Sequence, residues 1–134
     1  LHLPTPMVAA LIGEGGSGGA IALATGNRVV LFEHAAYCVI SPEGCASILW
    51  RSAEHAQAAA EAGRITSDWM KKLGVVDAVV TEPLGGAHRD PNAAIDALGD
   101  SFEAQLQSMA GMDAAALIAD RHNKYLTIGD SGLA

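Results

Sequence analysis

The feature that most restricts the fold is an apolar run that passes directly into a glycine-rich stretch. Residues 7–12 read MVAALI and residues 13–19 read GEGGSGG, so five of these seven residues are glycines. A short continuous apolar run is typical of a strand buried on both faces of a parallel sheet. The small residues 18–25 predict a short helix, with a stop signal at Gly26. We therefore expect a strand, a sharp turn of bare backbone, a helix, and a second strand at residues 28–32.

Cap signals divide the rest of the chain into helices, with further strands expected at residues 36–40 and 75–80. Ser41 precedes a proline and a glutamate, which predicts an N-cap, a proline at the first helical position and a favourable charge in the first turn. The remaining helices are expected at residues 52–63 (closed by Gly63), 66–74, 92–111 (capped by Asp90) and 113–125. The basic cluster RHNKY in the last helix is interpreted as a solvated face, and the tail from residue 127 as frayed.

Composition narrows the function classes. Half of the 134 residues are apolar, which suffices for a buried core in one domain. The formal net charge of -7 argues against a surface for nucleic acid or anionic membrane, which needs a surplus of Lys and Arg. No apolar run approaches the roughly 18 residues of a membrane-spanning helix, so we expect a cytoplasmic protein. Cys38 and Cys45 form no CxxC pair and are expected as reduced core thiols, with no metal held by this chain.

Backbone N–H groups at a strand-to-helix turn form a site for negative charge. A Walker-type phosphate loop is excluded, because Ala20 and not a lysine follows the last glycine. A dinucleotide fingerprint fits the spacing of Gly13, Gly15 and Gly18, with Glu33 about 20 residues further on. An oxyanion hole, in which N–H groups stabilise a developing anion, is the third candidate. A turn that needs glycine only for packing is the remaining alternative.

Three longer blocks carry a resemblance to a known family. They are the glycine stretch at 13–19, SPEGCASILW at 41–50 and EPLGGAHRDP at 82–91. Together they resemble the α subunits of bacterial acetyl-coenzyme A carboxylase carboxyltransferases, over nearly the whole chain but only the C-terminal part of that subunit. Several blocks in one order are more specific than a single glycine motif, so the dinucleotide hypothesis becomes the weaker one.

The resemblance implies a crotonase-like α/β fold of repeated β-β-α units. The chain would be a partial domain, with a core at about residues 1–90 and C-terminal helices at about residues 91–134. It also implies transfer of a carboxyl group from carboxybiotin to acetyl-CoA, which gives malonyl-CoA in the first committed step of fatty acid synthesis. In that scheme the N–H groups of Gly18 and Gly19 are catalytic and stabilise the biotin ureido anion. Gly15 and Gly16 would shape the approach of the substrate.

The same resemblance implies partners. The biotin would be carried on the biotin carboxyl carrier protein and carboxylated by biotin carboxylase. A zinc-containing β subunit would stabilise the thioester enolate, in an α2β2 assembly, and the chain would be active only together with it. No nucleic acid and no membrane is expected as a partner.

Three further residues are candidates for substrate binding. Hydratases of the crotonase superfamily, which this family resembles, carry glutamates at two positions: Ile21 occupies the first and cannot transfer protons, and Glu43 occupies the second, which favours carboxyl transfer. His88 and Arg89 follow a glycine pair in one loop, and Arg suits phosphate or carboxylate. The alternatives are a first-turn charge for Glu43 and a simple turn for the loop. Two alternative functions remain for the chain as a whole: a hydratase or isomerase of the same fold, or a non-catalytic assembly module.

Overall fold

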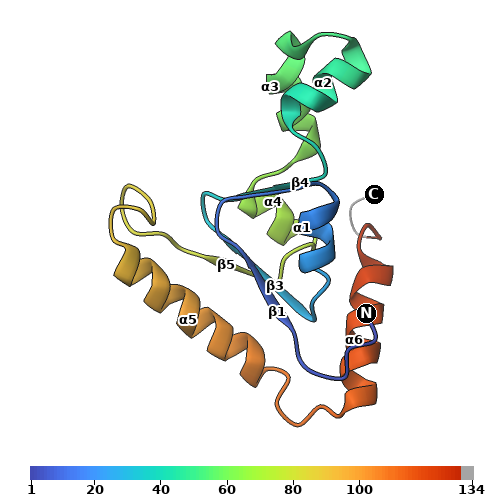
Figure 1. Ribbon diagram of the computed structural model, residues 1–134, viewed down its shortest axis with the longest axis vertical. Helices are drawn as coiled ribbons and strands as arrows, with labels where there is room; N and C mark the ends of the chain where they lie inside the picture. The colour runs from blue at the N-terminus through green and yellow to red at the C-terminus, as the bar shows by residue number, and fades with distance from the viewer. Residues whose placement is uncertain (131–134) are drawn as a thin grey trace.

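The computed structural model describes residues 1–130, and its strands form two small parallel sheets (Figure 1). The larger sheet has the order β1-β3-β5 and the smaller one pairs β2 with β4. Their bounds are Val8–Leu11 for β1, Glu14–Gly16 for β2, Arg28–Phe32 for β3, Ala36–Cys38 for β4 and Ala78–Val80 for β5. The predicted α/β architecture with parallel strands is confirmed.

A β-β-α unit occurs twice in succession. The first consists of β1, β2 and α1 (Ser17–Leu23), and the second of β3, β4 and α2 (Pro42–Trp50). Equivalent strands of the two units pair with each other: Ala10 lies opposite Val30 in one sheet, and Gly15 lies opposite Tyr37 in the other. Each strand of the glycine-containing first unit is therefore held in register by the unit that follows it.

The strand buried on both faces is β3 and not β1. Val30 and Leu31 are fully buried, because β3 lies between its two neighbours and is covered by helices. β1 is an edge strand whose residues are only half-buried, and Ile12 after it is 67% exposed. The prediction for residues 7–12 was thus right about the strand and wrong about its burial, because an apolar run does not reveal its place in the sheet order.

The glycine stretch is more ordered than the predicted turn. Residues Glu14–Gly16 form β2, a strand that the sequence pattern did not predict, because its stability depends on pairing with β4 and not on local propensity. Ser17 then starts α1 with a φ of 61°, a left-handed value that is costly for a residue with a side chain. The chain therefore passes from strand to helix within one strained residue.

Local cap chemistry explains the next helices. Ser41 caps α2 by accepting a hydrogen bond from the Gly44 N–H at 3.1 Å. A short 3-10 helix, η1 (Ala53–His55), leads into α3 (Ala56–Gly63), and α4 (Ser67–Lys72) follows. α3 ends at Gly63, as predicted, and the residue after it, Arg64, has a left-handed φ of 50°. Figure 1 shows α2 and α3 projecting together from one end of the molecule.

Two long helices complete the described part of the chain. Asp90 caps α5 (Pro91–Gln107) and Asp113 caps α6 (Ala114–Thr127), each by accepting a backbone N–H three residues on. Arg121 of α6 is fully buried, so the interpretation of the basic cluster as a solvated face is wrong for this residue. Figure 1 shows α6 beside the N-terminal segment. Of the tail predicted to fray, residues 131–134 lie outside the described part.

Candidate functional site

The first turn of α1 presents backbone N–H groups to open space. Gly16 is the N-cap and has no side chain to satisfy them, and the first N–H groups of any α-helix lack partners within the helix. Gly18 and Gly19 are exposed, and a Cβ built on either would meet no described atom within 4 Å. Packing inside the described chain therefore gives no reason for glycine at these two positions.

Gly15 differs from the other glycines of the stretch. A Cβ at this position would lie 1.9 Å from Leu11 Cδ2, so any side chain here would displace the end of the Leu11 side chain, and glycine lets β2 pack against the end of β1 as it does. At Gly16 the nearest atom to a Cβ is the carbonyl oxygen of Cys38 at 3.8 Å, an ordinary contact. In this stretch, close packing explains the glycine at position 15 but not those at positions 18 and 19. The hypothesis that the turn needs glycine only for packing therefore accounts for part of the stretch.

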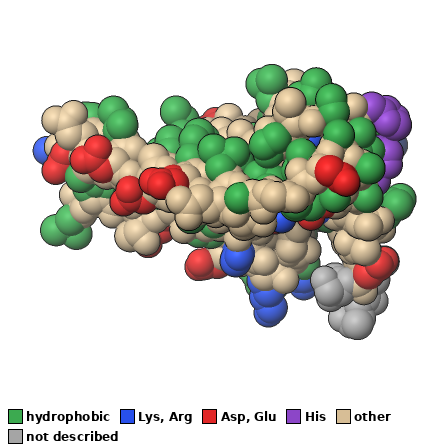
Figure 2. Space-filling model, turned by 90° about the horizontal axis from the view of Figure 1, so that it is seen from below, with side chains coloured by type: hydrophobic (Ala, Val, Ile, Leu, Met, Phe, Trp, Pro, Cys, Tyr) green, Lys and Arg blue, Asp and Glu red, His purple; other side chains and the backbone are tan. Residues whose placement is uncertain are grey.

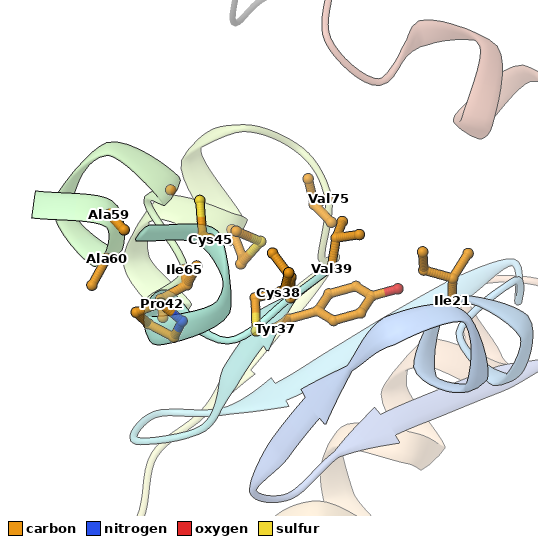
Figure 3. A pocket seen from close by; sticks show the side chains of 13 residues that line it. Ile21, Tyr37, Cys38, Val39, Pro42, Cys45, Ala59, Ala60, Ile65 and Val75 are labelled. Carbon is orange, nitrogen blue, oxygen red and sulfur yellow. The ribbon is translucent and has the colours of Figure 1, made fainter. Parts of the chain in front are cut away.

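The glycine stretch and α1 border two hollows. One of about 440 Å³ is lined by β1, by Gly13 to Gly16 and by the inner side of α1. The other, of about 390 Å³, lies between α1, β4, α2 and α3 (Figure 3). Figure 3 shows the Tyr37 ring extending toward Ile21, with Cys38 and Cys45 further along the wall. The space next to α1 can therefore accept an apolar group on either side.

The two cysteines are placed differently from the prediction. Both are free, but both are half-buried and line the second hollow, so they are wall residues and not core residues. Tyr37 belongs to the same wall, and its burial raises the pKa of its hydroxyl. Sequence reasoning missed this wall, because its residues come from five separate elements, α1, β4, α2, α3 and α4, and from the loops between them.

Glu43 lies in the first turn of α2, where it is exposed and next to the Ser41 cap. A carboxylate at this position is stabilised by the helix dipole. The Pro42 side of the same turn borders the hollow of Figure 3. The position is compatible with both interpretations of Glu43, as a first-turn charge and as a residue at the border of the site.

The loop with His88 and Arg89 is held by Glu82. The Glu82 carboxylate accepts hydrogen bonds from the Ala87 N–H at 2.7 Å and the His34 N–H at 3.0 Å. Partial burial opposes ionisation of Glu82, but these N–H donors and the nearby His34 ring outweigh it and lower the pKa of the carboxyl. His88 and Arg89 themselves are exposed.

The structure does not bring this loop to the helix start. Figure 1 shows the segment between β5 and α5 at one side of the sheet, and α1 at the other. Glu33, the acidic residue of the dinucleotide alternative, accepts the Glu82 N–H at 3.1 Å and so belongs to the anchoring of this loop. Residues 88 and 89 therefore form a contact surface separate from Gly18 and Gly19.

Within residues 1–130, no group of three or more His, Cys, Asp or Glu residues is arranged to hold a metal ion. None of the helices in that range is long and apolar enough to cross a membrane.

Comparison with solved structures identifies the class of fold. The chain is similar to a crystal structure of a Pseudomonas malonate decarboxylase hetero-tetramer in complex with coenzyme A, with a TM-score of 0.69 at 17% sequence identity. The similarity covers 97% of this chain and 51% of that one. With its repeated β-β-α units, the chain is a partial domain of the crotonase-like α/β fold.

Comparison of sequences identifies the family within this class. Residues 1–129 match the family model described as acetyl co-enzyme A carboxylase carboxyltransferase-like, and the chain belongs to this family. Acetyl-coenzyme A carboxylase carboxyl transferase subunits alpha are similar to it at 60% identity in Rhizorhabdus wittichii and 56% in Ruegeria pomeroyi. These matches cover 96% and 100% of this chain but only 41% and 42% of the two relatives. The chain thus spans about two fifths of their length.

Proposed function

We propose that this chain supplies the biotin side of a carboxyltransferase that moves a carboxyl group from carboxybiotin to acetyl-CoA and yields malonyl-CoA. Membership of the carboxyltransferase-like family supports the reaction class. The observation that carries the site is the pair Gly18 and Gly19 in the first turn of α1: both are exposed, and a Cβ built on either meets no described atom within 4 Å. The pair is the catalytic element of the proposal.

In this proposal the backbone N–H groups of the two glycines act by electrostatic stabilisation of negative charge. Carboxybiotin supplies the carboxyl group, and its release leaves negative charge on the ureido oxygen. Fixed N–H donors stabilise such charge without reorganising, and one donor of this kind is typically worth ~2.7–4 kcal/mol of barrier. The side chains at positions 18 and 19 would lean toward the helix N-terminus, so their absence leaves the path to the donors free.

The surroundings of α1 fit a flat ring on a tethered arm. The ureido ring of biotin is small, polar at one edge and apolar on its faces. The first hollow reaches Gly16, the N-cap of α1, and the second hollow, with Ile21 and Tyr37, lies further along the same helix. Gly15 and Gly16 contribute bare backbone beside the donors, Gly15 because Leu11 leaves no space for a side chain.

Partners and location form part of the same proposal. The names of the relatives as subunits support a multi-subunit enzyme. We assign a zinc-containing β subunit as its partner, in an α2β2 assembly that is active only as a whole. The biotin carboxyl carrier protein and biotin carboxylase are the further partners in this proposal. The site of action would be the cytoplasm. No metal is assigned to this chain, because the proposed charge stabilisation uses N–H groups alone.

Glu43, His88 and Arg89 have secondary roles in the proposal. Glu43 follows Pro42, which lines the apolar hollow, and at this position it contacts substrate or serves only the helix dipole. His88 and Arg89 lie in a separate exposed loop, so they are assigned to the carrier protein or to the outer part of the substrate. A hydratase would need a second proton-transferring group near α1, and Ile21 occupies that place.

The test is the reverse half-reaction, malonyl-CoA-dependent carboxylation of free biocytin. The enzyme is the full-length subunit that contains this chain, assembled with its β partner. Gly18→Pro deletes one N–H that has no partner within the helix, so no hydrogen bond of α1 is lost. We expect a loss of kcat of about 10²–10³, the value of one oxyanion-hole donor.

Size-exclusion chromatography and thermal melting of the variant complex provide the control. Loss of rate in an intact complex supports the assignment of the donor to residue 18. A normal rate in an intact complex refutes the assignment and leaves the glycine stretch with a structural role. Hydration of an enoyl thioester by the same complex, without carboxylation of biocytin, would favour the hydratase alternative.

A further inference from the structure

The helix that carries the proposed donors is weakly held by its own residues. None of the seven residues of α1, Ser17–Leu23, is buried, and its N-cap Gly16 has no side chain. Leu23 in its last turn is 79% exposed. Core packing therefore contributes little to the orientation of α1, which depends on the paired strand β2 before it and on a contact at its C-terminal end.

That contact comes from the far end of the chain. The Tyr125 hydroxyl on α6 lies 2.6 Å from the carbonyl oxygen of Ala24 and 2.9 Å from that of Gly26. Ala24 is the C-cap of α1, so these oxygens belong to the end and exit of the helix. One phenolic proton is shared between two carbonyl groups separated from it by about 100 residues of sequence.

Tyr125 is itself rigidly placed, because α6 is fastened to the ends of the strands. The buried Arg121 guanidinium donates to the carbonyl oxygens of Leu1, Leu3 and Thr5 at 2.8–2.9 Å, and to Asn27 Oδ1 at 2.6 Å. The ammonium group of Lys124, next to Tyr125, pairs with the Asp77 carboxylate that precedes β5. α6 is thus fixed to the segments before β1, β3 and β5.

We propose that Tyr125 is a positioning residue for carboxyl transfer: its hydroxyl anchors the C-terminal end of α1 and so aims the Gly18 and Gly19 N–H groups. This inference rests on the proposed function of those two glycines. α1 is about 10 Å long at 1.5 Å per residue. When such a short helix tilts about its middle, its two ends move by similar distances, so a shift at the C-terminal end displaces the first turn as well. A misplacement of 1 Å at a reacting group can cost about 100-fold in rate.

The test compares Tyr125→Phe with Thr127→Val in the assembled full-length enzyme. Tyr125→Phe removes one hydroxyl and keeps the ring, while Thr127→Val removes a hydroxyl that bonds only to carbonyl groups of α6 itself. Kinetics of biocytin carboxylation and hydrogen exchange of the peptide that covers residues 16–24 are measured for both. We expect Tyr125→Phe to lower kcat about 10- to 100-fold with KM unchanged, and to speed exchange in α1.

The outcomes separate this inference from the proposed function. Faster exchange in α1 with a lower kcat, in a complex that stays folded and assembled, supports it, and Thr127→Val should show neither effect. Unchanged exchange in α1 overturns it, whatever the rate. Faster exchange with a normal kcat also overturns it; in that case Gly18→Pro decides whether the glycine donors are catalytic at all.

Discussion

Replacing Gly18 by alanine separates a chemical role of this glycine from a structural one. The change keeps the backbone N–H and adds a single methyl group. Gly18 does not have a positive φ, and a Cβ built on it meets nothing within 4 Å in the described chain. The substitution is therefore free of clash, and it should leave the fold intact.

The expected effects on stability and on rate have opposite signs. Alanine is favoured over glycine inside a helix by roughly 0.5–1 kcal/mol, so the free energy of unfolding should rise by up to that amount. The new methyl group leans toward the helix N-terminus and occupies the path to the donors. If it displaces the ureido oxygen by about 1 Å, the rate of transfer falls by up to about 100-fold.

The matched control is Gly99→Ala. Gly99 lies within α5 and also has open space around its missing Cβ, but it is remote from α1 in the chain fold (Figure 1). Urea denaturation gives the stability of each variant, and biocytin carboxylation by the assembled enzyme gives kcat and KM. Both variants should be as stable as the wild type or more so, while only Gly18→Ala should lose activity.

Equal activity of the two alanine variants would refute the reasoning. It would mean that the space in front of Gly18 stays empty during the reaction. A loss of activity that follows a loss of stability would refute it as well, because the open surroundings predict no destabilisation.

Three further predictions concern the framework of the site. Gly15→Ala should cost about 1–3 kcal/mol of stability, because its Cβ meets the Leu11 side chain at 1.9 Å, and Leu11→Ala should restore part of it in urea denaturation. Arg121→Met should cost at least about 2 kcal/mol, because it removes four hydrogen bonds, one of them to the buried Oδ1 of Asn27, and a loss under about 0.5 kcal/mol would contradict this. Burial raises the pKa of Tyr125 to about 12 from 10.0, so the stability due to its hydroxyl is complete below pH 10 and is lost as the pH rises toward 12. Tyr125→Phe should lack this alkaline loss when the two proteins are melted across that range.

Charged side chains are unevenly distributed on the face of the molecule seen in Figure 2. Figure 2 shows hydrophobic side chains spread over one face, with acidic groups among them and the basic groups mostly at one side. The acidic and basic side chains of this chain, whose formal net charge is -7, are therefore not mixed evenly on that face.

Local signals were sufficient where the structure depends on neighbours in sequence. Ser41 and Asp90 cap helices as predicted, because a cap needs only a side-chain oxygen and the N–H groups two or three residues later. The strand-to-helix glycine pair at 18 and 19 was also found from local pattern, since the first N–H groups of a helix lack partners whatever the rest of the chain does. The catalytic use of that pair stays a prediction.

Long-range pairing was not visible in the same way. β2 was missed because Gly15 and Gly16 have low strand propensity, and only the β4 backbone stabilises them as a strand. Arg121 was assigned to a solvated face because charged residues are rarely buried, and here its acceptors lie more than 90 residues away along the chain. Tyr125 gave no local signal, because its partners follow α1 at the other end of the sequence.

The most direct test of the central claim is a structure of the assembled full-length enzyme with biocytin bound. We expect the ureido oxygen of biocytin within about 2.7–3.1 Å of the backbone nitrogens of Gly18 and Gly19, the range of an oxyanion-hole donor. A ureido oxygen bound by other groups, such as those of the His88 and Arg89 loop, with the start of α1 left free, would contradict it.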